Sequence, residues 1–125
     1  FRLTHQVHVY DIAGNEIGLI SQRLFTFLPT FDISVGGRPC GSIRKEFTFF
    51  KPSYSIEYGG WQCDGDFLSW NYSVTAGSRL VANIAKQLLS WGDTYTLDIS
   101  DPGDEIMALM LVIAIDAANC SQNNN

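Results

Sequence analysis

The sequence is poor in positive charge. Lys and Arg together number 8 against 13 Asp and Glu, which gives a net charge of -5 at pH 7. A protein that binds nucleic acid normally presents a basic face to neutralise phosphates, so this balance argues against a nucleic-acid partner. It also weakens any general attraction to an anionic membrane surface, although a local basic patch would still be compatible with it.

Cysteine and histidine are also scarce. The three cysteines, Cys40, Cys63 and Cys120, are an odd number, which argues against a disulfide framework and for a reducing, cytoplasmic compartment. Cys40 and Cys63 follow glycine turns at positions where other parts of the chain carry aliphatic residues, so we expect them in the core and not on a metal. His5 and His8 are three residues apart and would point to opposite faces of a strand, so no shared metal is expected.

Sequence motifs of catalysis are missing as well. The chain has no Gly-x-Ser-x-Gly nucleophile elbow, no P-loop and no dinucleotide-binding glycine pattern. We therefore expect a protein without enzymatic activity and without a cofactor. An enzyme with an unrecognised site at a barrel mouth stays open as an alternative, and a deep pocket on which Asp116, His5 or His8 converge would support it.

Aromatic residues, by contrast, are abundant, with 8 Phe, 5 Tyr and 3 Trp, and such side chains favour strands. Three stretches resemble one another: "QRLFTFLPTFDI" (residues 22–33), "KEFTFFKPSYSI" (45–56) and "KQLLSWGDTYTL" (86–97). Each has a turn signal in its middle, namely Leu28-Pro29-Thr30, Lys51-Pro52-Ser53 and Gly92-Asp93-Thr94. The sequence therefore predicts repeated hairpins in one domain, residues 1–120, followed by a polar tail, residues 121–125.

A second set of turns lies between the copies. Small-residue pairs suited to tight turns occur at Ala13-Gly14, Gly36-Gly37, Gly59-Gly60 and Ala76-Gly77. After each mid-copy turn the residues alternate between apolar and polar, which is the pattern of a strand with one buried face. Before those turns, strict alternation would place Gln22, Lys45 and Lys86 on the same face as the isoleucines two positions earlier. A bulge would avoid this, and the sequence does not decide between the two arrangements.

Residues 106–118 form a different element. Ten consecutive apolar residues, 106–115, predict a helix that is apolar on all sides, with Asp104 as its N-cap and Glu105 in its first turn. Such a helix belongs inside a protein, and thirteen residues are too short to cross a bilayer. The acidic run "DISDPGDE" before it matches a calcium loop only loosely, and a solvated turn with a helix cap explains it better.

Three segments, "KEFTFFKPSYSI", "SWGDTYTLDI" and "VIAIDA", resemble the bacterial LURP-one-related family, which is grouped with the Tubby C-terminal-like superfamily and the phospholipid scramblases. The resemblance extends from about residue 3 to residue 118. It implies an all-β antiparallel barrel, a meander of hairpins that encloses one C-terminal hydrophobic α-helix. Family barrels have about twelve strands, whereas we count nine or ten here, so we expect additional N-terminal strands in the natural protein.

The resemblance also suggests where a ligand would bind. Tubby domains bind phosphoinositides, and Lys45 and Lys86 occupy equivalent repeat positions, with Arg44 and Lys51 nearby in sequence. If the hairpins are neighbours, Lys45 and Lys86 lie about 10 Å apart and act together on one anionic headgroup. Asp116, a carboxylate late in an apolar helix, is expected to be hydrogen-bonded at the barrel mouth or to act as a polar plug.

The functional prediction is a non-enzymatic binding or scaffold domain in the cytoplasm, peripheral to the membrane if its partner is anionic phospholipid, or bound to a protein partner. The competing class is a scramblase-like membrane-active protein whose apolar helix leaves the barrel and enters lipid. The short helix and the acidic charge argue against that alternative. A filled barrel likewise argues against a carrier of small molecules.

Overall fold

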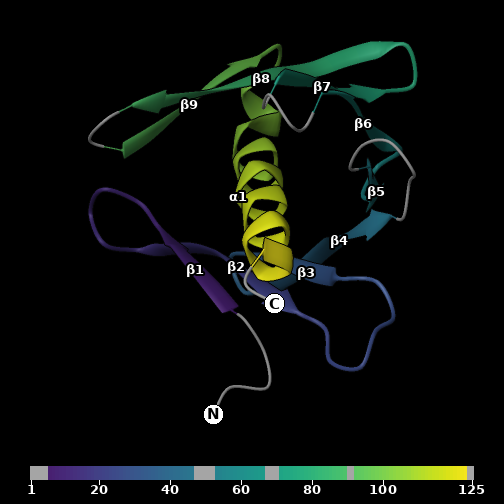
Figure 1. Ribbon diagram of the computed structural model, residues 1–125. Coiled ribbons are helices and arrows are strands. Elements are labelled where there is room, and N and C mark those ends of the chain that lie inside the picture. Colours follow the sequence, from purple (N-terminus) through teal and green to yellow (C-terminus); the bar gives the residue numbers. More distant parts are fainter. Residues whose placement is uncertain (1–5, 47–52, 67–70, 90–91, 124–125) are drawn as a thin grey trace.

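The computed structural model describes residues 6–46, 53–66, 71–89 and 92–123, and all structural statements below refer to these residues. It contains nine strands followed by a short 3-10 turn and one long helix (Figure 1). The number of strands agrees with the nine or ten expected from the hairpin repeats. In chain order the strands are β1 (Gln6–Tyr10), β2 (Glu16–Gln22), β3 (Thr30–Val35), β4 (Arg38–Glu46), β5 (Ser53–Glu57), β6 (Trp61–Asp66), β7 (Asn71–Ala76), β8 (Arg79–Leu89) and β9 (Gly92–Ile99).

The strands form two antiparallel sheets in which sequence neighbours pair. One sheet has five strands in the order β1-β2-β3-β4-β5, and the other has four in the order β6-β7-β8-β9. All four small-residue turns join consecutive strands as predicted, and their glycines have positive φ, for example Gly14 at 90° and Gly77 at 63°. The predicted hairpins are therefore confirmed at three of these turns, whereas the Gly59-Gly60 turn joins β5 and β6, which belong to different sheets.

The mid-copy turns agree less well with the prediction. Pro29 lies in the connection of residues 23–29 before β3, as expected. The predicted turn at Gly92-Asp93-Thr94 is wrong, because these three residues open β9 and Gly92 pairs with Leu89. Lys51 and Pro52 lie outside the described residues.

The helix α1 (Glu105–Asn123) is longer than predicted and continues into the expected polar tail. It follows a 3-10 turn, Pro102–Asp104, whose N-cap is Asp101 and not Asp104. The Asp101 carboxylate accepts the backbone N–H of Gly103 at 3.0 Å, which satisfies a donor at the turn start. Asp104 instead accepts Nη1 of Arg79 at 2.9 Å and so ties the start of the helix to β8.

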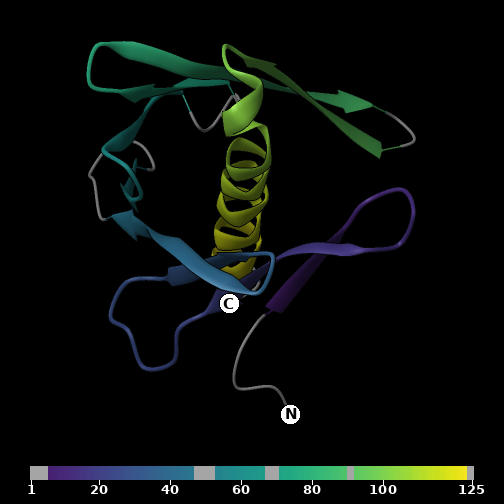
Figure 2. The same ribbon diagram turned by 180° about the vertical axis from the view of Figure 1, so that it is seen from behind.

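The four-stranded sheet lies toward the start of α1 and the five-stranded sheet toward its end, so the helix runs through the middle of the molecule between them (Figures 1 and 2). Ala108, Met110, Leu111, Ala114 and Ile115 have no exposed surface at all. They pack against apolar side chains that alternate along the inner faces of the strands, since a strand directs every second side chain to the same face. Those that are fully buried include Ile20, Phe31, Ile33, Ile43, Val74 and Ile84.

Closure of the two sheets into one barrel is not detected among the described residues. In the described parts of the chain β1 and β9 are the outer strands of different sheets and do not pair with each other. The sheets also part between β5 and β6, although those two strands are consecutive in the chain. The architecture is thus two antiparallel sheets around one C-terminal helix.

Candidate functional site

The three repeat copies place a polar residue opposite an aromatic one at the same register position. Strict alternation holds at these positions, so the polar residues share the inner face with the core isoleucines. The bulge considered from the sequence does not occur there. The cross-strand pairs are Gln22–Phe31 in β2 and β3, Lys45–Tyr54 in β4 and β5, and Lys86–Tyr95 in β8 and β9.

Lys86 and Asp116 form an ion pair that joins β8 to α1. The Lys86 Nζ lies 3.5 Å from Asp116 Oδ1, and the side chains are 9% and 39% exposed. The same ammonium lies 5.3 Å from the centre of the Tyr95 ring, within cation–π range. The carboxylate that looked out of place in an apolar helix therefore balances a lysine that points inward.

Further polar groups surround this pair. Burial raises the pKa of Tyr72, and the charged forms of nearby groups raise it further. Those groups are Cys63, Tyr95, Tyr54 and Asp116. The hydroxyl oxygens of Tyr72 and Tyr95 are fully buried. The interior thus holds a cluster of titratable groups next to α1, in a place where ionising a further group is costly.

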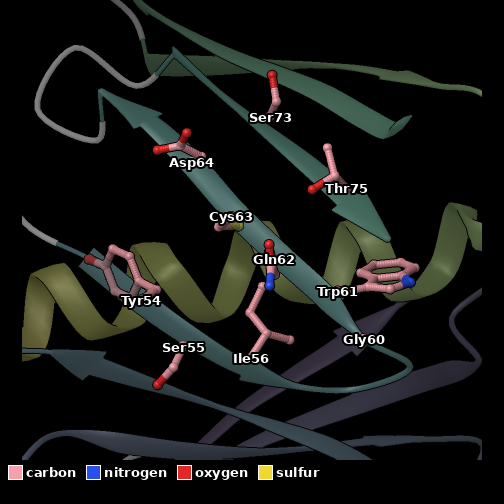
Figure 3. A pocket seen from close by; sticks show the side chains of 10 residues that line it. All are labelled: Tyr54, Ser55, Ile56, Gly60, Trp61, Gln62, Cys63, Asp64, Ser73 and Thr75. Carbon is pink, nitrogen blue, oxygen red and sulfur yellow. The ribbon is translucent and has the colours of Figure 1, made fainter. Parts of the chain in front are cut away.

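An open cleft of about 690 Å³ lies between β5 and β6, beside this cluster (Figure 3). This volume falls within the range of ordinary ligand pockets. Its inner wall carries apolar and aromatic side chains, whereas its rim carries hydroxyl, amide and carboxylate groups. The lining residues include Tyr54, Ile56, Trp61 and Cys63 on the inner faces, and Ser55, Gln62, Asp64, Ser73 and Thr75 at the rim.

The cleft exists because β5 and β6, although a tight turn joins them, do not pair as strands within the described residues. The N–H of Trp61 donates to the carbonyl of Tyr58 at 2.8 Å, and the two rings meet edge to face with centroids 4.8 Å apart. Beyond this turn the strands belong to different sheets. One backbone edge of β5 and one of β6 therefore face the cleft.

The predicted anion-binding residues come from both sheets, and their joint action on one headgroup stays a prediction. Lys45 and Lys86 lie in different sheets, on β4 and β8, so the assumption that they sit on neighbouring hairpins is wrong. Both face the interior, and burial lowers the pKa of Lys45. Only Arg44 is on the outer face, and Lys51 lies outside the described residues.

Arg44 is held by a carboxylate on its own strand. Its Nε donates to Glu46 Oε2 at 2.9 Å, and the Ser55 hydroxyl donates to the same oxygen. These two contacts lower the pKa of Glu46. Arg44 and Arg23 border one small depression of about 140 Å³ on the outer face of the five-stranded sheet.

The remaining candidates have structural roles. His8 Nδ1 contacts the Glu16 carboxylate across β1 and β2, and His5 lies outside the described residues. Cys40 and Cys63 are half-buried and pack against the core, as predicted. In the part of the chain that the structure covers, no group of three or more His, Cys, Asp or Glu side chains is arranged to hold a metal ion.

Sequence reasoning missed one surface feature, the connection of residues 23–29. Leu24, Phe25 and Phe27 are exposed there, although phenylalanine in a β protein is normally a core residue. The available signal was Pro29, which lies between these residues and β3 and marks the stretch as a turn.

A β-rich domain built around a central C-terminal helix is the class that this geometry defines. The family model described as LURP-one-related matches residues 1–116, and the chain belongs to that family. The uncharacterised protein YxjI of Bacillus subtilis is 32% identical over 116 residues, which cover 93% of this chain and 72% of that protein. No solved structure matches the chain.

Cys63 should react poorly with thiol reagents. Burial, and secondarily the charge of Asp64, raise the pKa of its thiol to about 12. At pH 8 such a thiol is ionised in roughly 1 molecule in 10,000, against about a quarter for an ordinary cysteine. We expect iodoacetamide to label Cys63 at least about a hundredfold more slowly in the native protein than in denaturant, measured by peptide mass spectrometry. Equal labelling rates in the two states would contradict the buried, protonated thiol.

Proposed function

We propose that this chain is a non-enzymatic binding or scaffold domain, and that the cleft between β5 and β6 takes an extended segment of a partner protein. The observation that carries the proposal is the pair of strand edges that face the cleft and that, within the described residues, do not pair with each other. An extended segment placed between two such edges gains backbone hydrogen bonds, and pockets for alternate side chains add selectivity.

The composition of the cleft supports the same partner. Ile56 offers a partly exposed apolar side chain to an extended peptide, and Tyr54 and Trp61, which are almost fully buried, form the floor of the cleft behind it. Gln62 and Asp64 offer polar contacts at the rim, and Asp64 favours a neutral or basic segment over an acidic one. Free thiols at Cys40 and Cys63 are consistent with the cytoplasmic location that we propose for the domain.

An enzyme is a weaker proposal than a binding domain. Cys63, the thiol at the cleft, has a raised pKa, which is the opposite of what a nucleophilic cysteine needs. Asp116 is engaged by Lys86 and does not line the cleft. The scramblase-like alternative is also weaker, because the helix that would have to enter lipid has its central residues fully buried. No helix within the described residues is long and apolar enough to cross a membrane.

Anionic phospholipid is the second candidate partner. The observation that favours it is the depression on the outer face that Arg23 and Arg44 border together, since guanidinium groups recognise phosphate. Both groups already contact carboxylates, Asp32 and Glu46, which weakens the attraction. Binding at this place would make the domain peripheral to the membrane. It predicts that the protein floats with anionic vesicles and that increasing salt abolishes this flotation.

The peptide proposal is tested by panning a random-peptide phage library on the full chain. We expect enriched peptides whose affinity falls at least about tenfold in Gln62→Trp, because the indole obstructs the cleft that Gln62 lines; tenfold corresponds to about 1.4 kcal/mol. Ala85→Trp is the matched control, since Ala85 is exposed on β8 and does not line the cleft. Fluorescence polarisation measures both. Enriched peptides that bind both variants equally, or no enrichment at all, would contradict the proposal.

We also propose that the two sheets are walls of one barrel around α1, as the family resemblance implies. Contact of both sheets with the same helix supports this. The outer edge of β9 should then carry backbone hydrogen bonds beyond those to β8. NMR couplings across hydrogen bonds, recorded on the full-length protein, would detect them for Tyr95–Ile99. Solvent-exchanging, unbonded amides along that edge would contradict closure.

A further inference from the structure

The connection between β2 and β3, residues 23–29, carries the most exposed aromatic side chains in the described chain. Phe25 is 98% exposed and Phe27 is 88% exposed, and Leu24 beside them is also exposed. Large apolar side chains gathered in water mark a contact surface and not a packing accident. In Figures 1 and 2 the connection projects beyond the five-stranded sheet, at the end of the molecule where α1 ends.

The base of this connection is firmly held, so its tip is presented in a defined position. The N–H of Arg23 donates to the Thr30 carbonyl at 2.8 Å, and the Lys45 N–H donates to the Pro29 carbonyl at 2.9 Å. The Arg23 guanidinium makes two contacts with the Asp32 carboxylate, at 2.7 and 3.2 Å. The anchoring groups come from β3 and β4 as well as from the connection itself.

Phe25 has φ +58°, and it is the one non-glycine residue with positive φ among those described. A bulky side chain in this region of backbone conformation is unfavourable and needs an explanation. The conformation turns the chain at the tip of the connection, where the apolar side chains stand in solvent. Phe25 thus combines an unfavourable backbone conformation with almost complete exposure. Both features are explained if a partner covers this part of the connection when it binds.

We propose that residues 24–27 insert into the interfacial layer of a phospholipid bilayer. The six residues 24–29 carry no charge, so the tip can enter an apolar layer without burying an ion. Aromatic side chains favour the boundary between headgroups and acyl chains. Arg23 lies directly behind the tip, and Arg44 borders the same depression. Both guanidinium groups already contact carboxylates, and Glu57 lines the depression too, so they add only a weak attraction to headgroup phosphates.

The driving force must come from insertion, because the net charge of -5 repels an anionic surface. The proposal is therefore separate from the peptide cleft, and it differs from headgroup binding by an electrostatic patch. It predicts attachment to neutral vesicles and little dependence on salt. Electrostatic attachment would show the opposite pattern.

The test is flotation of the full chain with phosphatidylcholine vesicles, and with vesicles that also contain phosphatidylglycerol, at low and physiological salt. We expect the wild type to float with both, and Phe25→Ser/Phe27→Ser to lose at least about tenfold in partitioning. Ile12→Ser is the matched control, because Ile12 is fully exposed on the β1–β2 turn and should not contribute. All three proteins should unfold at similar temperatures, since the altered side chains are in solvent.

Two results would overturn the proposal. Flotation only with anionic vesicles, abolished by salt and unchanged in the double phenylalanine variant, would assign membrane contact to the cations instead. No flotation under any condition would exclude a bilayer as the partner of residues 24–27. An apolar groove on another protein would then be the remaining partner for them. Either result leaves the peptide-cleft proposal intact, since that depends on Gln62 variants and not on vesicles.

Discussion

The apolar surface of α1 between Met107 and Ala118 has to be shielded from water, and the rest of the fold follows from that constraint. An apolar surface all round must be covered all round, and one flat sheet covers a single side only. The two sheets around α1 meet this requirement together, and residues such as Leu111 and Ile115 are fully buried as a result. Because the helix fills the space between the sheets, little room for a bound molecule is left on the axis. A partner of the kind that we propose would then bind where the covering is incomplete, in the cleft between β5 and β6, or at the connections that project from the sheets.

The repeated polar position shows how the same hairpin serves different purposes around the helix. Gln22, Lys45 and Lys86 stand at one register position and all face inward. At Lys86 the inward charge is balanced by Asp116 of α1, so a polar contact sets the rotation and height of the helix relative to β8. Apolar packing tolerates sliding, whereas a partly buried ion pair is favourable in few geometries, which is a reason to keep charges in such a place.

The hairpins, the tight turns and the central helix could be predicted from the sequence, because each depends on local periodicity and turn chemistry. The break between β5 and β6 could not, since the alternation of Tyr54 and Ile56 is the same whether or not the next strand pairs. The inward direction of Lys45 and Lys86 was visible in the alternation, but a lysine is so commonly at the surface that the pattern invited a bulge. The exposure of Phe25 and Phe27 could not be predicted for the converse reason, because phenylalanine is commonly a core residue.

We infer that α1 and both sheets form one cooperative core. Native-state hydrogen exchange tests it most directly, because it measures the free energy at which each segment opens. If the core is cooperative, amides of α1, such as Leu111 and Ile115, exchange at the same free energy of opening as those of Ile33 in one sheet and Ile84 in the other. If α1 exchanged through a much less costly opening while the strands stayed protected, the helix would be a separable element. That result would contradict the account and favour a helix able to leave the sheets.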